Sequence, residues 1–545
     1  MGSNQIYTRK VVYNYLANTI KYKESMAGTF SLSSDYWKSL QVTSQDVEVL
    51  HTHLFEIETP LTTQDLSLIF VEMRVKSERE AQAREHQAGG KTFLPKDKFS
   101  VGDNLVFPVF DWKKGKVIAT RSGVNPDAGE FDVITVALAD GSEKMFAAGL
   151  ANHILNEERG TAAEEENLSA ETILQENGIE IEKKLEEAFV KDEGLVKIAG
   201  RWFPRGLLVD VNEGHLNLAE AVLDMAQGEP QPTSALMKDI ELPAGVNPKL
   251  TEFSLNYALQ NDSRFDEVGP RGEVLWCLRR LEPDGVRDVP PTLQYSRIEH
   301  DRSALDDAML KLEAQLDDEL SEINAFERKD LKEVTISLIY PHLRAGTLPL
   351  SAHTRLLFPT ALESPRVRFT LVDGKSGLKI PAWAVLEHGY VFGLRNWYKN
   401  LQLIPGSLVS VKRGQKPGEV IIEAKTQRSS KDWVRTLIVG TDGGLVFAML
   451  KQAITAEFND RMAIYVPDFK ALDPLWTKNR SFEDLVVSVM REMTKLTPQG
   501  HVHAQELYAA VNLVRRVPPA PLFALLASQP RFIHVGDLHF RLEEE

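Results

Sequence analysis

The chain has 545 residues, 43% of them hydrophobic, which is enough for about three to five domains with separate cores. A single cysteine excludes a disulfide framework and a cysteine-rich zinc site, and no apolar run is long enough for a membrane span or preceded by the basic residues of a secretion signal. The net charge of −15 argues against a protein that coats nucleic acid, and the composition predicts a cytoplasmic protein that does not contact membranes.

Helices followed by short strands are expected in the first third of the chain. Residues 1–90 are predicted to be helical, and one interpretation is a degenerate helix-turn-helix unit that lacks a wing. Residues 93–156 contain four or five short strands separated by turns, which predicts a small closed β-barrel. This pattern resembles the Tudor-like barrels of transcription factors and chromatin readers, which bind protein, nucleic acid or nothing. An exposed pair of aromatic residues, Phe110 and Trp112, would suit a partner surface, and ordinary core positions are the alternative.

Two acidic segments separate the other predicted domains. Residues 157–193 hold thirteen acidic and four basic side chains, and residues 299–333 hold twelve acidic ones. Charge runs of this kind usually lie on solvated faces. We therefore predict acidic helical connectors at 157–200 and 298–345.

The sequence Arg-Phe-x-x-Val-Gly occurs twice, at 264–269 and 531–536, each time ahead of a turn and an aromatic strand. Each copy follows three helical stretches with apolar periodicity. Three helices and a two-stranded wing form a winged-helix domain, and a duplicated pattern is stronger evidence than one occurrence. We predict winged-helix domains at 201–285 and 480–545. We expect Phe265 and Phe532 to be buried against the helices of their domains, and Trp276 and Phe540 to lie on the returning strand.

The first of these domains resembles the HARE-type winged helix and the related domain of the bacterial RNA polymerase delta subunit. The resemblance rests on Gly228-Glu229-Pro230 after the first helix and on Asp262, Arg264 and Phe265 before the wing. Its third helix has one cation, Lys249, whereas recognition helices usually carry several. We therefore favour protein docking over DNA reading for this copy. Two residues make the second copy a better DNA contact, Arg515 and Arg516.

A basic segment lies inside this acidic chain. Residues 364–435 contain thirteen Lys or Arg against five Asp or Glu, the charge distribution of a nucleic-acid-binding face. The strands and turns of 362–435 resemble the DNA-binding pseudobarrel of plant transcription factors and some restriction enzymes, and 436–478 is predicted to be a mixed α/β extension. Alternatively, the patch only balances the acidic connectors. The residues that the resemblance maps onto DNA contacts are Lys375, Lys379, Arg395 and Lys399.

One strand has a pattern typical of nucleases. Glu423-x-Lys425 ends a predicted strand, and many nucleases place a metal-binding carboxylate beside a water-activating lysine in this way. The preceding turn, however, lacks the second carboxylate that the metal needs. The closely spaced His501 and His503 have no carboxylate or thiol nearby in sequence and are interpreted as surface or capping residues. We therefore predict no catalytic residues, no cofactor and no metal.

Together these patterns predict a multidomain α+β protein built from winged-helix units, a small β-barrel and a β-pseudobarrel. The function that they favour is non-enzymatic DNA binding, in transcription or on DNA-processing machinery, with duplex DNA and RNA polymerase or another DNA-processing protein as partners. One alternative is a specificity or accessory subunit of a restriction or defence system, or a decayed metal-dependent nuclease. Another is a scaffold whose acidic connectors bind basic partners.

Overall fold

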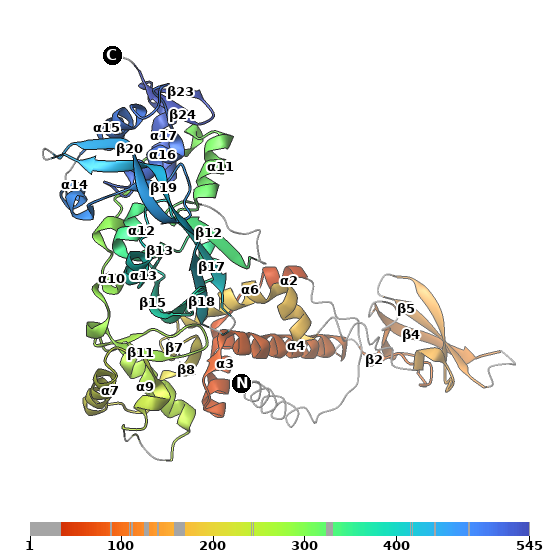
Figure 1. The fold of residues 1–545 in the computed structure, drawn as a ribbon. Coiled ribbons are helices and arrows are strands. Elements are labelled where there is room, and N and C mark those ends of the chain that lie inside the picture. Colours follow the sequence, from red (N-terminus) through yellow and green to blue (C-terminus); the bar gives the residue numbers. More distant parts are fainter. Residues whose placement is uncertain are drawn as a thin grey trace. The chain divides into compact units, whose positions relative to one another are not determined.

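In the computed structural model, the chain divides into two compact units, Met1–Val196 with Arg201–Leu207 and Lys197–Gly200 with Leu208–Glu545. Helices alternate with several separate sheets, which makes this a multidomain α+β protein, as predicted (Figure 1). No helix in the described part of the chain is long and apolar enough to cross a membrane. The structure describes residues 34–87, 90–107, 110, 113–124, 130–138, 141–156, 169–240, 242, 245–322, 331–414, 416, 418–440, 443–477 and 480–543.

One order of elements occurs three times: a helix, a short strand, two further helices and a two-stranded hairpin. In each copy the short strand pairs with the second hairpin strand, so the second hairpin strand lies in the middle of a three-stranded sheet. We refer to residues 44–204, 213–278 and 482–542 as the N-terminal, middle and C-terminal repeats. Their elements are α3 (Ser44–Ile57), β1 (Leu61–Thr62), α4 (Thr63–Gln87), α6 (Ala170–Phe189), β7 (Leu195–Ile198) and β8 (Arg201–Pro204); α7 (Glu213–Met225), β9 (Gln231–Pro232), α8 (Thr233–Leu236), α9 (Pro248–Gln260), β10 (Phe265–Glu267) and β11 (Leu275–Leu278); and α15 (Phe482–Thr494), β22 (Val502–His503), α16 (Ala504–Val511), α17 (Pro519–Ser528), β23 (Phe532–Gly536) and β24 (His539–Leu542).

The middle and C-terminal repeats share one strand register. Phe265 and Phe532 each begin the first hairpin strand, and each lies opposite a leucine of the second. Trp276 and Phe540 on the second strand each lie opposite the first residue of the short strand. These four side chains are at most 5% exposed, which confirms the predicted burial of Phe265 and Phe532.

The N-terminal repeat has an aromatic residue at the same position. Trp202 lies opposite the first residue of β1, and its indole N–H donates to the Thr63 hydroxyl over 3.0 Å. The Trp276 N–H donates to Asn256 over 2.9 Å, and the hydroxyl of Thr233, the counterpart of Thr63, bonds to the same amide over 2.6 Å. A buried indole N–H requires such an acceptor. In the C-terminal repeat, phenylalanine and alanine occupy these two positions and require none.

The N-terminal repeat differs from the sequence prediction of a wingless unit at 1–90 and a solvated connector at 157–200. Helix α6 lies in that connector segment, yet Ile181, Leu185 and Phe189 along one of its faces are buried in the same core as α3 and α4. Strands β7 and β8 then supply the hairpin. The many glutamates occupy the exposed stripe of α6 and conceal its apolar periodicity in a charge count.

A five-stranded sheet is inserted between α4 and α6. Its strands follow one another in sequence order around a core rich in phenylalanine, as the prediction of a small strand-rich domain at 93–156 implies. Phe110 is 39% exposed and lies 4.9 Å from the Lys144 ammonium, whereas Trp112 is outside the described residues. The strands are β2 (Lys91–Thr92), β3 (Asn104–Phe107), β4 (Lys113–Ser122), β5 (Asp132–Leu138) and β6 (Glu143–Ala148).

A seven-stranded sheet lies between the middle and C-terminal repeats in sequence. Its order is β12-β17-β18-β14-β15-β16-β13, and only β14 and β18 pair in parallel. Five strands fall where the sequence predicts them in 362–435; the edge strands β12 and β13 come from earlier residues. The elements are β12 (Glu333–Ser337), α12 (Tyr340–Ala345), β13 (Thr347–Pro349), β14 (Arg366–Asp373), β15 (Lys379–Val385), β16 (Tyr390–Phe392), α13 (Arg395–Asn400), β17 (Leu408–Arg413) and β18 (Glu419–Ala424).

A long two-stranded ribbon follows the seven-stranded sheet and crosses the predicted boundary between 362–435 and 436–478. Its strands are β19 and β20, with the short β21 pairing in parallel beside β19. Figure 1 shows the ribbon near α15, which β20 contacts. The bounds of the ribbon and of the remaining α-helices are β19 (Thr426–Val439), β20 (Leu445–Ala456), β21 (Ile464–Tyr465), α2 (Ser34–Lys38), α10 (Asp284–Arg287), α11 (Asp307–Leu316) and α14 (Asp473–Trp476).

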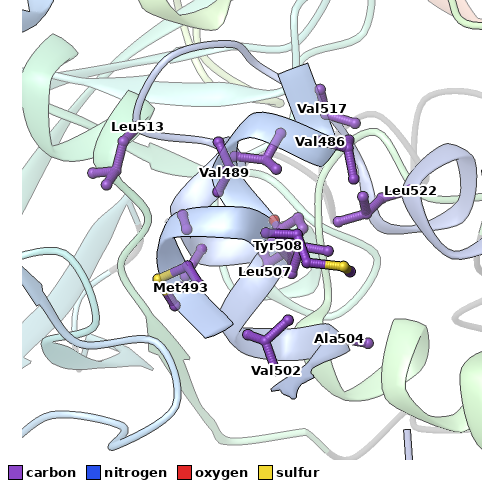
Figure 2. Packing of buried hydrophobic residues seen from close by; sticks show 14 of the residues in the cluster. Val486, Val489, Met493, Val502, Ala504, Leu507, Tyr508, Leu513, Val517 and Leu522 are labelled. Carbon is purple, nitrogen blue, oxygen red and sulfur yellow. The ribbon is translucent and has the colours of Figure 1, made fainter. Parts of the chain in front are cut away.

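The C-terminal repeat has a dense apolar core. Side chains of α15 and α16, among them Val489, Met493 and Leu507, converge there with Leu522 of α17 (Figure 2). Helix α17 is buried along most of its length, because α11 and the residues before it also pack against it. The third helix of this repeat is therefore covered by its own chain.

Candidate nucleic-acid interface

Four of the six cations predicted to contact DNA are exposed, and they lie in a turn, on a strand and on a helix. Lys375 lies in the turn between β14 and β15, and Lys379 begins β15. Arg395 and Lys399 lie four residues apart on α13, a spacing that places them on one face of the helix.

Strand pairing brings the start of α13 to the edge of the sheet where β14 ends. Strands β14 and β15 are antiparallel, as are β15 and β16, so β16 runs toward the edge at which β15 begins, although its last residue, Phe392, pairs with Trp383, four residues after Lys379. Gly393 continues β16 with a φ of +126°, and a Cβ atom there would lie 2.7 Å from the Pro381 carbonyl oxygen. The Leu394 N–H then donates to Gly346 over 2.9 Å. The turn and α13 therefore frame one edge of the sheet.

Nearby protein groups hold three of the four cations. The Lys375 ammonium donates to the Thr426 hydroxyl over 2.5 Å, and Lys379 lies 3.5 Å from the Glu419 carboxylate. Among the described residues, Arg395 reaches only a backbone carbonyl, that of Ala345, at 3.5 Å. These exposed contacts are weak enough for phosphate to replace them.

Much of the cation excess of 364–435 is neutralised by acids outside that segment. Arg366 pairs with Glu282 at 2.6 Å, and Arg368 lies 3.3 Å from Glu229, so both link β14 to the middle repeat or the residues just after it. Arg435 pairs with Glu506 of the C-terminal repeat. These three arginines are thus paired, but none of their partners lies in the acidic connectors that the alternative interpretation has the patch balance. The cations at the sheet edge remain exposed.

None of the third helices in the three repeats, as far as the structure describes them, offers a cationic face. Helix α6 carries six glutamates and two lysines, α9 carries the single cation Lys249, and α17 is largely buried. Third helices that read DNA need exposed donors for phosphates and base edges. Helices α6 and α9 have few of them, and α17 is covered.

The structure removes Arg516 from the predicted DNA contacts. Its side chain is fully buried, and its guanidinium donates to Asp318 over 2.6 Å and to Glu319 over 2.7 Å. Burial alone would raise the pKa of Glu319, but the charges of Arg516 and His342 outweigh this effect and hold it below its usual range. Arg515 is half-buried, with its guanidinium 5.8 Å from the Phe482 ring centroid.

The partners of Arg516 belong to the predicted solvated connector at 298–345, and there too the structure differs. The side chains of Asp317, Asp318 and Glu319 are at most 11% exposed, and each binds a different set of groups. Asp317 accepts from the Ser351 hydroxyl over 2.5 Å, Asp318 accepts from the Tyr508 hydroxyl over 2.5 Å, and Glu319 lies 3.1 Å from His342. The acidic run thus connects α12 and the residues after β13, next to the seven-stranded sheet, to the C-terminal repeat.

The strand with the nuclease-like pattern has a carboxylate beside it, but on the other face of the sheet. Asp373 pairs in register with Ile422, so its side chain shares the interior face with Ile422, whereas Glu423 and Lys425 point to the opposite face. Asp373 also accepts hydrogen bonds from Lys375 N and the Ser376 hydroxyl. No group of three metal-ligating side chains occurs in the part of the chain that the structure describes.

The predicted capping role of the closely spaced histidines holds for His503, which caps α16 by accepting from Gln505 N over 3.1 Å. Its other ring nitrogen lies 2.8 Å from the Arg461 guanidinium. Burial, together with the charge of Arg461, lowers the pKa of His503 to about 4. His503 is therefore neutral at pH 7.

Comparisons with protein-family models, curated proteins and solved structures find no match to this chain.

Proposed function

We propose that this chain is a non-enzymatic DNA-binding protein that docks on transcription or other DNA-processing machinery, with duplex DNA held at the edge of the seven-stranded sheet. In this proposal the three repeats are winged-helix units, the seven-stranded sheet is the pseudobarrel and the inserted sheet is the Tudor-like barrel. The observation that carries it is the exposure of Lys375, Lys379, Arg395 and Lys399 around one sheet edge.

Charge supports this assignment of roles. Phosphate contacts from lysine and arginine supply most of the affinity of non-specific DNA binding, and exposed cations are free to make them. The third helices of the repeats are acidic, nearly uncharged or covered, which suits attachment to proteins, including other parts of this chain, better than insertion into a groove. RNA polymerase, or another DNA-processing protein, is the kind of partner that such units would bind.

A salt titration of duplex binding tests the proposal. The double variant Arg395→Ala/Lys399→Ala should weaken binding by about 1–3 kcal/mol if the side chains contact bases, or lower the salt slope by about 1 for each phosphate that is no longer neutralised. Lys249→Ala is the matched control, because it removes an exposed cation from the third helix of the middle repeat and should leave binding unchanged. Equal binding by the wild type and the double variant at every salt concentration would remove α13 from the interface.

A further inference from the structure

The ribbon formed by β19 and β20 has one face on which an aromatic residue is surrounded by cations. Strand register places Lys431 opposite Ala453, Trp433 opposite Lys451 and Arg435 opposite Met449. Because side chains alternate between faces along a strand, Lys431, Trp433, Arg435, Met449 and Lys451 share one face. Asp432 lies on the other.

The part of this face that contains Leu437 and Phe447 packs against the C-terminal repeat. Leu437 and Phe447, further along the same face, are buried in the core of that repeat. Arg435 pairs with Glu506 and donates to the Asp460 carbonyl over 2.6 Å. The packed part and the Arg435 contacts hold the neighbouring part of the ribbon in place, and the side chain of Trp433 there faces solvent.

Trp433 is 61% exposed, whereas Trp37, Trp202, Trp276 and Trp383 are at most 5% exposed. Its ring contacts the Lys451 ammonium at 5.3 Å from the centroid, and Met449 beside it is 41% exposed. An indole needed only for packing would be covered. An exposed ring between lysines instead offers a stacking surface with neutralising charges on both sides.

We infer that this face of the ribbon binds single-stranded DNA, with an unpaired base stacked on Trp433 and with Lys431 and Lys451 contacting the adjoining phosphates. Stacking on an aromatic ring tolerates any base, and the surrounding lysines follow the backbone. The inference rests on the proposed function in taking DNA as the ligand. It adds a second site for unpaired strands, separate in sequence from the duplex-binding cations.

The test uses the full chain and two fluorescently labelled probes, oligo(dT) about ten nucleotides long and an abasic oligonucleotide of equal length. Fluorescence anisotropy at low salt should show tighter binding of oligo(dT), because only that probe has bases to stack. Trp433→Ala should weaken oligo(dT) binding about tenfold or more, while Trp433→Phe should retain most of it. Lys431→Ala/Lys451→Ala should lower the salt slope for both probes.

Ile438→Ala is the matched control, since Ile438 is 44% exposed on the other face of the same ribbon and should not affect binding. Equal binding of the two probes, or unchanged oligo(dT) binding by Trp433→Ala, would overturn the inference. If Trp433→Ala keeps oligo(dT) binding but no longer co-purifies with proteins that bind the wild type, the face is a protein-docking surface. Arg395→Ala/Lys399→Ala should retain oligo(dT) binding. Loss of duplex binding in that variant alone therefore reports on the proposed function and not on this site.

Discussion

At the scale of single residues, position decides what each arginine does. Arg395 and Arg516 carry the same group, yet Arg395 is exposed at a sheet edge and Arg516 is enclosed by two carboxylates. The sequence separation between Arg516 and Asp318 is 198 residues, so no local pattern predicts their contact. A buried charge requires such a partner.

Arg516→Ala should destabilise the C-terminal repeat by about 3–5 kcal/mol, because it leaves Asp318 and Glu319 buried without their counter-charge. Chemical denaturation measures the change in the free energy of unfolding, and hydrogen exchange in α15 and α16 assigns it to this repeat. Arg515→Ala is the control, with an expected change of about 1 kcal/mol or less for a half-buried side chain. Similar stability losses in the two variants would contradict the role assigned to the buried pair.

His503 should make the stability of the C-terminal repeat pH-dependent. Its folded pKa of about 4 lies below the usual 6.5, so folding favours the neutral ring. The resulting stabilisation is complete above pH 6.5 and is lost as the pH falls from 6.5 toward 4, by roughly 3 kcal/mol. His503→Gln should flatten this part of the profile in thermal melts at pH 7.5, 6 and 5. A variant that keeps the wild-type pH profile would show that other groups control it.

At the scale of elements, sequence reasoning predicts what is local and misses what is interrupted. The middle and C-terminal repeats show their shared pattern because their helices and hairpins are consecutive, and five strands of the seven-stranded sheet follow alternation and turn residues. The N-terminal repeat is only partly predictable, because the five-stranded sheet separates α4 from α6. The glutamates of α6 also make its segment look like a charged connector when only charges are counted, because its apolar face adds nothing to that count.

If α6 is a core helix, Leu185→Ala should destabilise the N-terminal repeat by about 2–5 kcal/mol, the usual cost of truncating a fully buried leucine. Glu187→Ala on the exposed face of the same helix should change stability by less than about 0.5 kcal/mol. Thermal unfolding of the full chain, with hydrogen exchange in α3 and α4 as a local probe, distinguishes the two. A neutral Leu185→Ala would fit the connector interpretation instead.

At the scale of the whole molecule, ion pairs occupy some cations of this acidic protein and leave others exposed. Ion pairs bind β14 to the middle repeat and the acidic run at 317–319 binds the C-terminal repeat, so the seven-stranded sheet has charged contacts to both. Charge counts along the sequence cannot separate cations used in these contacts from cations left at the surface. The sheet edge and the ribbon face carry exposed cations, and so does strand β4, with Lys113, Lys114, Lys116 and Arg121.

Hydrogen exchange of the full chain, with and without saturating duplex DNA at low salt, tests the central claim most directly. Bound DNA should slow exchange in the turn at 374–378 and in α13, because a ligand protects the backbone that it covers or rigidifies. Exchange in α9 and α17 should stay unchanged. Protection of α9 or α17 without protection of α13, or no protection anywhere, would contradict the placement of DNA at the edge of the seven-stranded sheet.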